Sequence, residues 1–258
     1  MVGLPSRLRR QFSTALIAHR GFHNERRGIV ENSASAFCAA IVKRFAIETD
    51  VRSAADGEPV IFHDERLDRL TGLRGDVSAT SARLLGETRL RLTDDTILHL
   101  SQFLALVRGR VPIILEVKSG WPSDPRFLAK VARLASSYSG RICVMSFDPE
   151  VLGFFARAAT NIPRGLGLSH PRHIANAGVA PVQAMRLLPS RAVSIARADF
   201  LAIDKAALHL PPLAALRKKT GLPIAVWTLT SPPEARAHLR HASAIIFEGF
   251  HPGHAWRM

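Results

Sequence analysis

Short apolar runs alternate along this chain with stretches in which apolar residues recur every three or four positions. The clearest pair is the run VPIILEVK at 111–118, followed by the helical spacing of DPRFLAKVARLASSY at 124–138. Because the first pattern is typical of a buried strand and the second of an amphipathic helix, their alternation predicts repeated strand–helix units. We expect eight such strands, at 16–20, 45–50, 112–118, 141–147, 164–169, 200–205, 223–229 and 244–248.

The predicted helices begin and end at residues with known capping preferences. Asn32 or Ser33 precedes the first helix, Pro149 stands in the first turn of another, and Gly109 and Gly221 close two more. Such residues pair the free backbone groups at helix ends or adopt the backbone conformation required there. Helices are expected at 33–44, 97–109, 124–138, 148–159, 180–189, 210–221 and 231–241.

The alternation is interrupted in the first half of the chain. The strand-like segment 45–51 is soon followed by another at 58–64, and Asp56-Gly57 between them is a hairpin signal. We therefore expect the second segment to return antiparallel along the first. Residues 64–98 are polar and irregular and predict an inserted loop.

Eight strand–helix units in a chain of about 250 residues favour an α/β fold, a closed (β/α)8 TIM barrel, with a small insertion after the second strand. No Gly-, Ser- or Pro-rich linker divides the sequence, so a single domain over residues 1–258 is expected. A doubly wound open sheet is the alternative. It would place a glycine-rich phosphate loop after its first strand, and HRGFHNERRG does not match that loop.

The net charge is strongly positive, +14 from 35 Lys+Arg against 21 Asp+Glu. This balance favours anionic partners, such as small phosphate esters. The basic residues are scattered and lack an aromatic motif, so no nucleic-acid partner is expected. The basic segment 5–12 leaves a weak peripheral contact with anionic membranes open.

No apolar run is long enough for a transmembrane segment, and the N-terminus lacks the apolar core of a signal peptide. Cys38 and Cys143 stand in separate apolar elements without metal-ligand spacing, so we expect two buried, reduced thiols. These features predict a cytoplasmic protein. Nothing in the sequence indicates an oligomeric state.

Polar residues end most of the predicted strands, where a barrel collects its active-site side chains. Glu48 and Asp50 lie two apart and share one face of a strand, and Glu116 and Lys118 share a face of the next. Three converging carboxylates would repel one another unless a cation lay between them, and oxygen ligands suit Mg²⁺ or Ca²⁺. Inward salt bridges, from Glu116 to Lys118 or Arg20, explain the same spacing equally well.

Two histidines are expected near these carboxylates. His19 ends the first strand, and the hairpin would bring His63-Asp64 back beside Glu48 and Asp50. Histidines at such a site can move both protons of phosphodiester cleavage, one from the nucleophile and one to the leaving oxygen. Either histidine alone is equally typical of a polar strand end.

The chain resembles the glycerophosphodiester phosphodiesterase family in several short motifs, which follow the family's order and spacing. They are AHRG (18–21), EN (31–32), IETDV (47–51), DGEPVIFHD (56–64), LEVK (115–118), SF (146–147) and VWTL (226–229). The resemblance implies a TIM barrel that hydrolyses glycerophosphodiesters to sn-glycerol 3-phosphate and an alcohol. It also implies a divalent cation, Mg²⁺ or Ca²⁺, as cofactor.

The resemblance assigns roles to residues at the strand ends. By their motifs, Glu48, Asp50 and Glu116 are similar to the metal ligands. His19 and His63 are similar to the acid–base pair, and we expect His19 to act as the base and His63 as the acid.

Further residues are expected to contact the substrate. Arg20 and Lys118 resemble phosphate-binding cations, and Glu31 resembles a further polar member of the site. Trp227 is expected to pack against the glycerol or the alcohol, although a core aromatic explains it equally well. The weaker candidates are His170, for which a solvated loop is the alternative, and Lys205, for which the alternative is a salt bridge to Asp204.

Two positions depart from the family's pattern. Val30 replaces a proline before Glu31, and Phe247-Glu248 stands where the family's last strand ends in Thr-Asp. The second departure puts the shape of that side of the pocket in question. The segment between His63 and Glu116 is short, so no restrictive lid over the alcohol is expected.

Two other functions stay open at this point. A phospholipase D of the sphingomyelinase type shares similar barrel and motifs, but those toxins are secreted and carry disulfides, which this chain lacks. A non-enzymatic basic barrel bound to anionic membranes would account for the net charge of +14 and for segment 5–12.

Overall fold

The computed structural model describes residues 16–170 and 189–253. The chain divides into two compact units, residues 18–142 and residues 1–17 with 143–258, called below the N-terminal and C-terminal units. The two strands β1 (Leu16–Ala18) and β5 (Ile142–Ser146) cross the boundaries between these units. The expected single domain over 1–258 stays a prediction.

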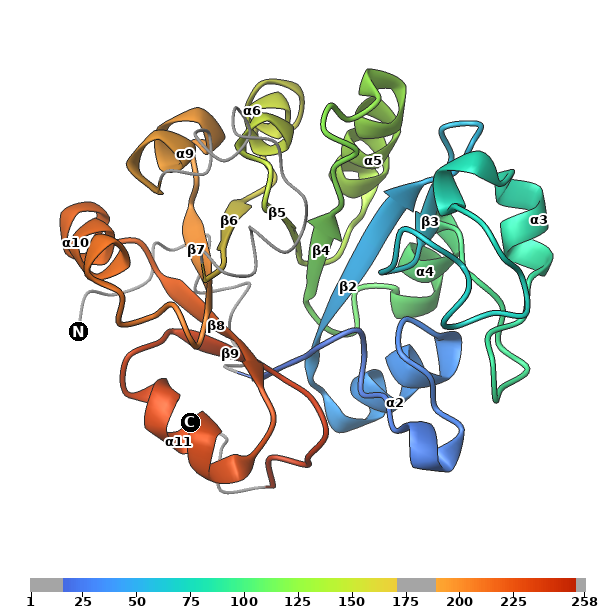
Figure 1. Cartoon of the computed structure of the whole chain (residues 1–258), viewed down its shortest axis with the longest axis horizontal. Helices are drawn as coiled ribbons and strands as arrows, with labels where there is room; N and C mark the ends of the chain where they lie inside the picture. The colour runs from blue at the N-terminus through green and yellow to red at the C-terminus, as the bar shows by residue number, and fades with distance from the viewer. Residues whose placement is uncertain (1–15, 171–188, 254–258) are drawn as a thin grey trace. The chain divides into compact units, whose positions relative to one another are not determined.

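The N-terminal unit contains the predicted hairpin. Strand β2 (Ala46–Ser53) pairs parallel with β4 (Ile113–Val117) and antiparallel with β3 (Pro59–Ile61), which confirms the return of the chain at Asp56-Gly57 (Figure 1). Gly57 has a φ of 73°, a conformation that glycine adopts without strain. In the parallel pair, Asp50 stands opposite Glu116.

Three of the predicted helices lie in this unit, as α2 (Ala34–Lys43), α4 (Leu100–Val107) and α5 (Pro125–Ser137). The cap of α2 is Ser33, whose side chain accepts a hydrogen bond from the Ala36 amide at 3.1 Å. Helix α4 starts three residues later than predicted because the extended chain before it continues to His99, which caps the helix.

Residues 64–98 are more ordered than their polar sequence predicts. They include the helix α3 (Ala82–Glu87) and the 3-10 turn η2 (Val77–Ala79), which the expectation of an irregular loop missed. Buried apolar side chains spaced along the segment pack together, and this burial explains the order. They include Leu67, Leu70, Val77, Ala82, Leu85, Leu90 and Ile97.

The C-terminal unit repeats strand and helix in a regular series. Its strands run parallel in the order β5-β6-β7-β8-β9. The elements are α6 (Pro149–Ala158), β6 (Arg164–Leu168), α9 (Pro189–Ala196), β7 (Phe200–Asp204), α10 (Pro211–Thr220), β8 (Ile224–Leu229), α11 (Pro232–Leu239) and β9 (Ala244–Phe247). The predicted helix 180–189 lies outside the described residues except for Pro189, where α9 begins.

The expectation of two buried thiols is wrong for one cysteine. Cys143 is buried in β5, but Cys38 is exposed on α2. Helix α2 buries Ala36, Phe37 and Ala40, and a residue one position after Phe37 is turned by about 100° away from that face. Both thiols are free. Among the described residues, no helix is long and apolar enough to cross a membrane.

Candidate active site

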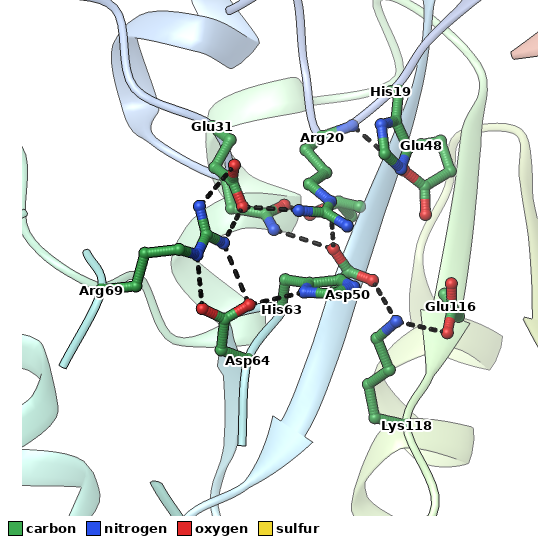
Figure 2. A network of polar contacts seen from close by, with 12 residues as sticks. His19, Arg20, Glu31, Glu48, Asp50, His63, Asp64, Arg69, Glu116 and Lys118 are labelled. Atoms are coloured by element: carbon green, nitrogen blue, oxygen red, sulfur yellow. Dashed lines mark hydrogen bonds and ion pairs between the residues drawn. The ribbon is translucent and has the colours of Figure 1, made fainter. Parts of the chain in front are cut away.

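Three acidic side chains meet in the N-terminal unit as the strand pattern predicts. Glu48 and Asp50 alternate with Thr49 on β2, and Glu116 lies on the neighbouring β4 in register with Asp50. Carboxylate oxygens of the three residues lie within 4.8 Å of one another (Figure 2), and all three are buried. The three side chains converge because every second residue of a strand points to the same face, and because the two parallel strands are aligned with Asp50 opposite Glu116.

Lys118 neutralises part of this acidic cluster. Its Nζ lies 2.9 Å from Asp50 Oδ1 and 2.5 Å from Glu116 Oε1. Burial alone would lower the pKa of Lys118, but the two carboxylates raise it, so the amine stays charged. The salt bridge from Glu116 to Lys118, which the sequence offers as the alternative to a metal site, is therefore present.

Burial and neighbouring charge separate the two acids of β2. The pKa of Glu48 is raised well above its usual range by burial and by the charges of Asp50 and Glu116. Burial would also raise the pKa of Asp50, but Lys118, His63 and Arg20 hold it well below its usual range. Of these two acids, Glu48 is therefore the one whose negative charge is less offset by neighbouring positive charges.

The turn after β1 places His19 and Arg20 against Glu48. The Nε2 of His19 lies 3.9 Å from Glu48 Oε2, and the Arg20 amide donates a 3.0 Å hydrogen bond to the same oxygen. A Cβ at Gly21 would lie 2.9 Å from Ala36, so only glycine lets the turn approach α2 this closely. The first strand is shorter than predicted, ending at Ala18.

Glu31 and Asn32 hold the site from the loop before α2. Glu31 Oε1 accepts a 2.7 Å hydrogen bond from Arg20, and Asn32 donates from Nδ2 to Asp50 Oδ2 at 2.9 Å. Thr49 donates to the Asn32 side-chain oxygen at 2.7 Å, which orients the amide. Asn32 was one of the two residues expected to cap α2, but Ser33 is the cap. Asn32 has a φ of 54°, and its side chain orients Asp50.

His63 follows the hairpin arm β3 and lies among the same charges. Its Nδ1 is 2.7 Å from Asp64 Oδ1, and Arg52 donates from Nε to its carbonyl at 2.7 Å. Burial first, and then the charge of Lys118, lower the pKa of His63 to about 4. The imidazole is therefore neutral near pH 7 in this environment.

Arg69 is a residue of this network that the sequence did not predict, because it lies in the segment expected to be an irregular loop. Its guanidinium binds Glu31 through Nη1 at 3.0 Å and Nη2 at 2.7 Å, and Asp64 through Nε at 2.6 Å (Figure 2). Leu67 and Leu70, which stand on either side of Arg69 in the sequence and are buried, were the signal that this part of the segment is ordered.

Three expected substrate residues lie in the C-terminal unit. Trp227 packs its ring against Phe147, with centroids 5.5 Å apart. The amide of His170 donates to Asp204 at 3.4 Å. Lys205 forms its ion pair with Glu234 at 2.7 Å rather than with Asp204, because α11 brings that acid to the end of β7. None of these contacts tests a substrate role.

The three carboxylates fit a hard divalent cation. In the described part of the chain, Glu48 Oε1 is buried without a hydrogen-bond partner, so one oxygen of the cluster has its lone pairs unused. A buried unpaired carboxylate oxygen is costly, and a cation among three such groups would remove that cost. The all-oxygen donor set matches Mg²⁺ or Ca²⁺ rather than a softer metal.

Buried acids beside arginine and lysine, at the ends of parallel strands, are what a β/α enzyme that acts on a phosphate ester requires. The chain belongs to the glycerophosphoryl diester phosphodiesterase family, whose model matches residues 19–247. The resemblance seen in the sequence is thereby confirmed, and the protein is a phosphodiesterase.

Individual relatives agree with this assignment. A glycerophosphodiester phosphodiesterase of Caldanaerobacter subterraneus is 27% identical over 176 residues, which cover 63% of this chain and 71% of the relative. The solved glycerophosphodiester phosphodiesterase from Agrobacterium tumefaciens C58 is similar with a TM-score of 0.67 and 25% identity, covering 90% of this chain and 95% of the other.

A third relative supports the fold. A phosphodiesterase from Oleispira antarctica, solved in complex with the product sn-glycerol-3-phosphate, gives a TM-score of 0.73 at 19% identity and covers 90% of this chain and 92% of its own. Together with the Agrobacterium structure it confirms the predicted (β/α)8 TIM-barrel fold.

Proposed function

We propose that this phosphodiesterase hydrolyses glycerophosphodiesters to sn-glycerol 3-phosphate and an alcohol, with a divalent cation held by Glu48, Asp50 and Glu116. The observation that carries the proposal is the convergence of these buried carboxylates, within 4.8 Å of one another, in a member of this family. The product named for the Oleispira antarctica phosphodiesterase supports the choice of product.

When bound, Mg²⁺ or Ca²⁺ supplies Lewis-acid polarisation of a phosphate oxygen and offsets developing negative charge. Among the described residues, Glu48 is the one acid with a buried side-chain oxygen that has no hydrogen-bond partner, and this oxygen is available to hold the cation.

Arg20 and Lys118 bind the phosphate and stabilise the charge that grows on its oxygens during the reaction. Arg20 is already oriented, because Glu31 accepts a hydrogen bond from its Nη1 at 2.7 Å. Burial would lower the pKa of Arg20, but Asp50, Glu31 and Glu48 raise it, so its charge persists. The substrate phosphate then shares these cations with the carboxylates.

The two histidines move the protons. His19 takes the proton of the nucleophile, which is water or the glycerol 2-hydroxyl, as its oxygen bonds to phosphorus. The bond from phosphorus to the alcohol oxygen breaks, and His63 gives that oxygen a proton from Nε2. Where the 2-hydroxyl attacks, water then opens the cyclic phosphate to give sn-glycerol 3-phosphate.

Asp64 supports the proton transfer from His63, because it holds the Nδ1 of His63 at 2.7 Å and so fixes the orientation of the ring. Burial and the charges of Lys118 and Arg20 keep the pKa of free His63 low. The negative phosphate offsets these two cations, so His63 takes up a proton on Nε2 when the substrate binds and can then act as the acid.

The test is product analysis with the purified chain and glycerophosphocholine, in the presence of Mg²⁺ or Ca²⁺. We expect sn-glycerol 3-phosphate and choline, and no product after chelation. Lysophosphatidylcholine is offered in a parallel reaction, since preferential release of choline from it would identify the phospholipase D alternative. Binding to anionic vesicles without hydrolysis of either ester would favour the membrane-binding alternative. A cytoplasmic location stays a prediction.

A further inference from the structure

A polar cavity of about 500 Å³ opens beside the carboxylate cluster, within the N-terminal unit. It lies between the end of β2, the segment 65–78 and the loop that leads from β4 into α5. Lys118 lines this cavity and also binds Asp50 and Glu116. A phosphate held by Lys118 would therefore have the cavity as its neighbour.

Four serines and six charged side chains, three basic and three acidic, line this cavity, which is called here the serine cavity. Its serines are Ser53, Ser78, Ser119 and Ser123. Among the described residues that line it, Phe127 is the single aromatic residue, and its side chain is buried with 1% exposure. The cavity therefore offers hydrogen bonds but no accessible aromatic face.

Arg52 lines the serine cavity without an ion pair to any residue that the structure describes. It is half-buried, and its Nε donates to the His63 carbonyl at 2.7 Å. No other hydrogen bond is found for its guanidinium in the described part of the chain. Burial lowers the pKa of Arg52, and the charge of Glu65, which lines the same cavity, acts against this effect. By contrast, Arg66 on the same wall pairs with Asp76 at 3.2 Å, and Asp124 pairs with Arg126 at 2.9 Å.

We propose that the serine cavity receives the alcohol moiety of the substrate, and that Arg52 makes it selective for polyhydroxylated alcohols such as inositol or glycerol. This inference rests on the proposed hydrolysis of glycerophosphodiesters. A guanidinium with free N–H groups donates to hydroxyl oxygens. A quaternary ammonium has no oxygen or lone pair that could accept these hydrogen bonds, and it is recognised instead by aromatic side chains, which this wall does not expose.

The test compares kcat/KM for glycerophosphoinositol, glycerophosphoglycerol and glycerophosphocholine. The native chain is expected to favour the two hydroxylated esters by about tenfold or more, the worth of one hydrogen bond to a charged group. Arg52→Gln should lower this preference severalfold, mainly through a higher KM for the hydroxylated esters. Arg83→Gln is the matched control, since Arg83 is exposed, pairs with Glu87 and does not line the cavity.

Arg52→Gln also removes the hydrogen bond from Arg52 to the His63 carbonyl, so a second variant tests the cavity without changing that bond. Ser78 is exposed on the cavity wall, so Ser78→Trp fills the space without burying a new group in the core. It should raise KM for glycerophosphoinositol more than for the smaller glycerophosphoethanolamine.

The outcomes distinguish the cavity assignment from the proposed function. Equal kcat/KM for all esters, or a preference unmoved by both Arg52→Gln and Ser78→Trp, overturns the cavity assignment while leaving the proposed hydrolysis intact. Failure to hydrolyse any of the esters overturns the proposed function itself.

Discussion

The Nδ1 atom of His63 lies 2.7 Å from Oδ1 of Asp64, so the carboxylate fixes the ring of one expected catalytic histidine. Arg69 holds that carboxylate from the other side, through Nε at 2.6 Å and Nη2 at 2.9 Å. Its guanidinium also binds Glu31, which in turn orients Arg20. One arginine of the segment 64–98 thus supports both the histidine and Arg20, the expected phosphate-binding cation.

Asp64→Ala should lower kcat by roughly 10- to 100-fold, the usual effect of removing a group that orients a functional histidine. Arg20 and Lys118, the cations proposed to bind the phosphate, stay in place, so KM should change by less than kcat. Steady-state kinetics with glycerophosphocholine measures both values. Asp68→Ala is the control, since Asp68 is an acid of the same segment 64–98 and pairs with Arg66. An equal loss in both variants would contradict the orienting role of Asp64.

His19→Ala and His63→Ala should each lower kcat by about 100-fold or more. If His63 protonates the departing alcohol, its replacement should matter much less for a p-nitrophenyl ester, whose leaving group needs no proton. His19→Ala should slow both esters alike. Kinetics with the alkyl and the aryl ester measure this difference, and an equal loss for His63→Ala on both would assign the acid role elsewhere.

Mg²⁺ or Ca²⁺ should raise the melting temperature of the native chain, because a ligand that binds the folded state stabilises it. Glu48→Gln removes one of the proposed metal ligands and should abolish this increase. Without metal, the same variant should melt a few degrees higher than the native chain. Glu48 is buried beside Asp50 and Glu116, and the neutral amide removes their repulsion. Thermal melts with metal and with chelator measure both changes. A metal-induced shift that survives in Glu48→Gln would remove Glu48 from the ligand set.

Arg69→Gln should destabilise the protein near pH 7 but much less near pH 2. Burial would raise the pKa of Asp64 and Glu31, but Arg69 contributes most to lowering both, that of Asp64 to about 2. A carboxyl whose pKa is lower when folded stabilises the fold above its unfolded pKa, about 4, and loses that contribution as pH falls through the folded value.

Melting temperatures of the native chain and of Arg69→Gln, measured between pH 2 and 7, therefore check the role of Arg69. The difference between the two should shrink as the pH falls below about 4. Arg83→Gln removes an exposed charge of the same unit and should show no such convergence. A constant difference across this range would contradict the electrostatic role of Arg69.

The acidic cluster was predictable because it depends on two simple periodicities. Side chains two apart on a strand share a face, which aligns Glu48 with Asp50. Parallel pairing in register then brings Glu116 opposite Asp50. The hairpin was predictable for a similar reason, since Asp56-Gly57 supplies the turn that returns the chain toward His63.

The segment 64–98 was poorly predicted because its order comes from packing rather than from local propensity. Its apolar residues are separated by charged ones, and the pattern has no single period. Burial of Leu67 and Leu70 decides where Arg69 lies, and that burial depends on residues as distant as Leu90 and Ile97. The exposed position of Cys38 depends likewise on which face of α2 packs inward.

The sequence by itself determined the alternation of strands and helices, the hairpin, the family and the acids and histidines of the candidate site. Local spacing suffices for these, because strand and helix periods act over a few residues. Only the tertiary structure decided the partners of these groups. The contacts of Arg69 with Glu31 and Asp64, the bond from Asn32 to Asp50 and the unpartnered oxygen of Glu48 join segments far apart in the chain. Such contacts arise from packing, which no local pattern specifies.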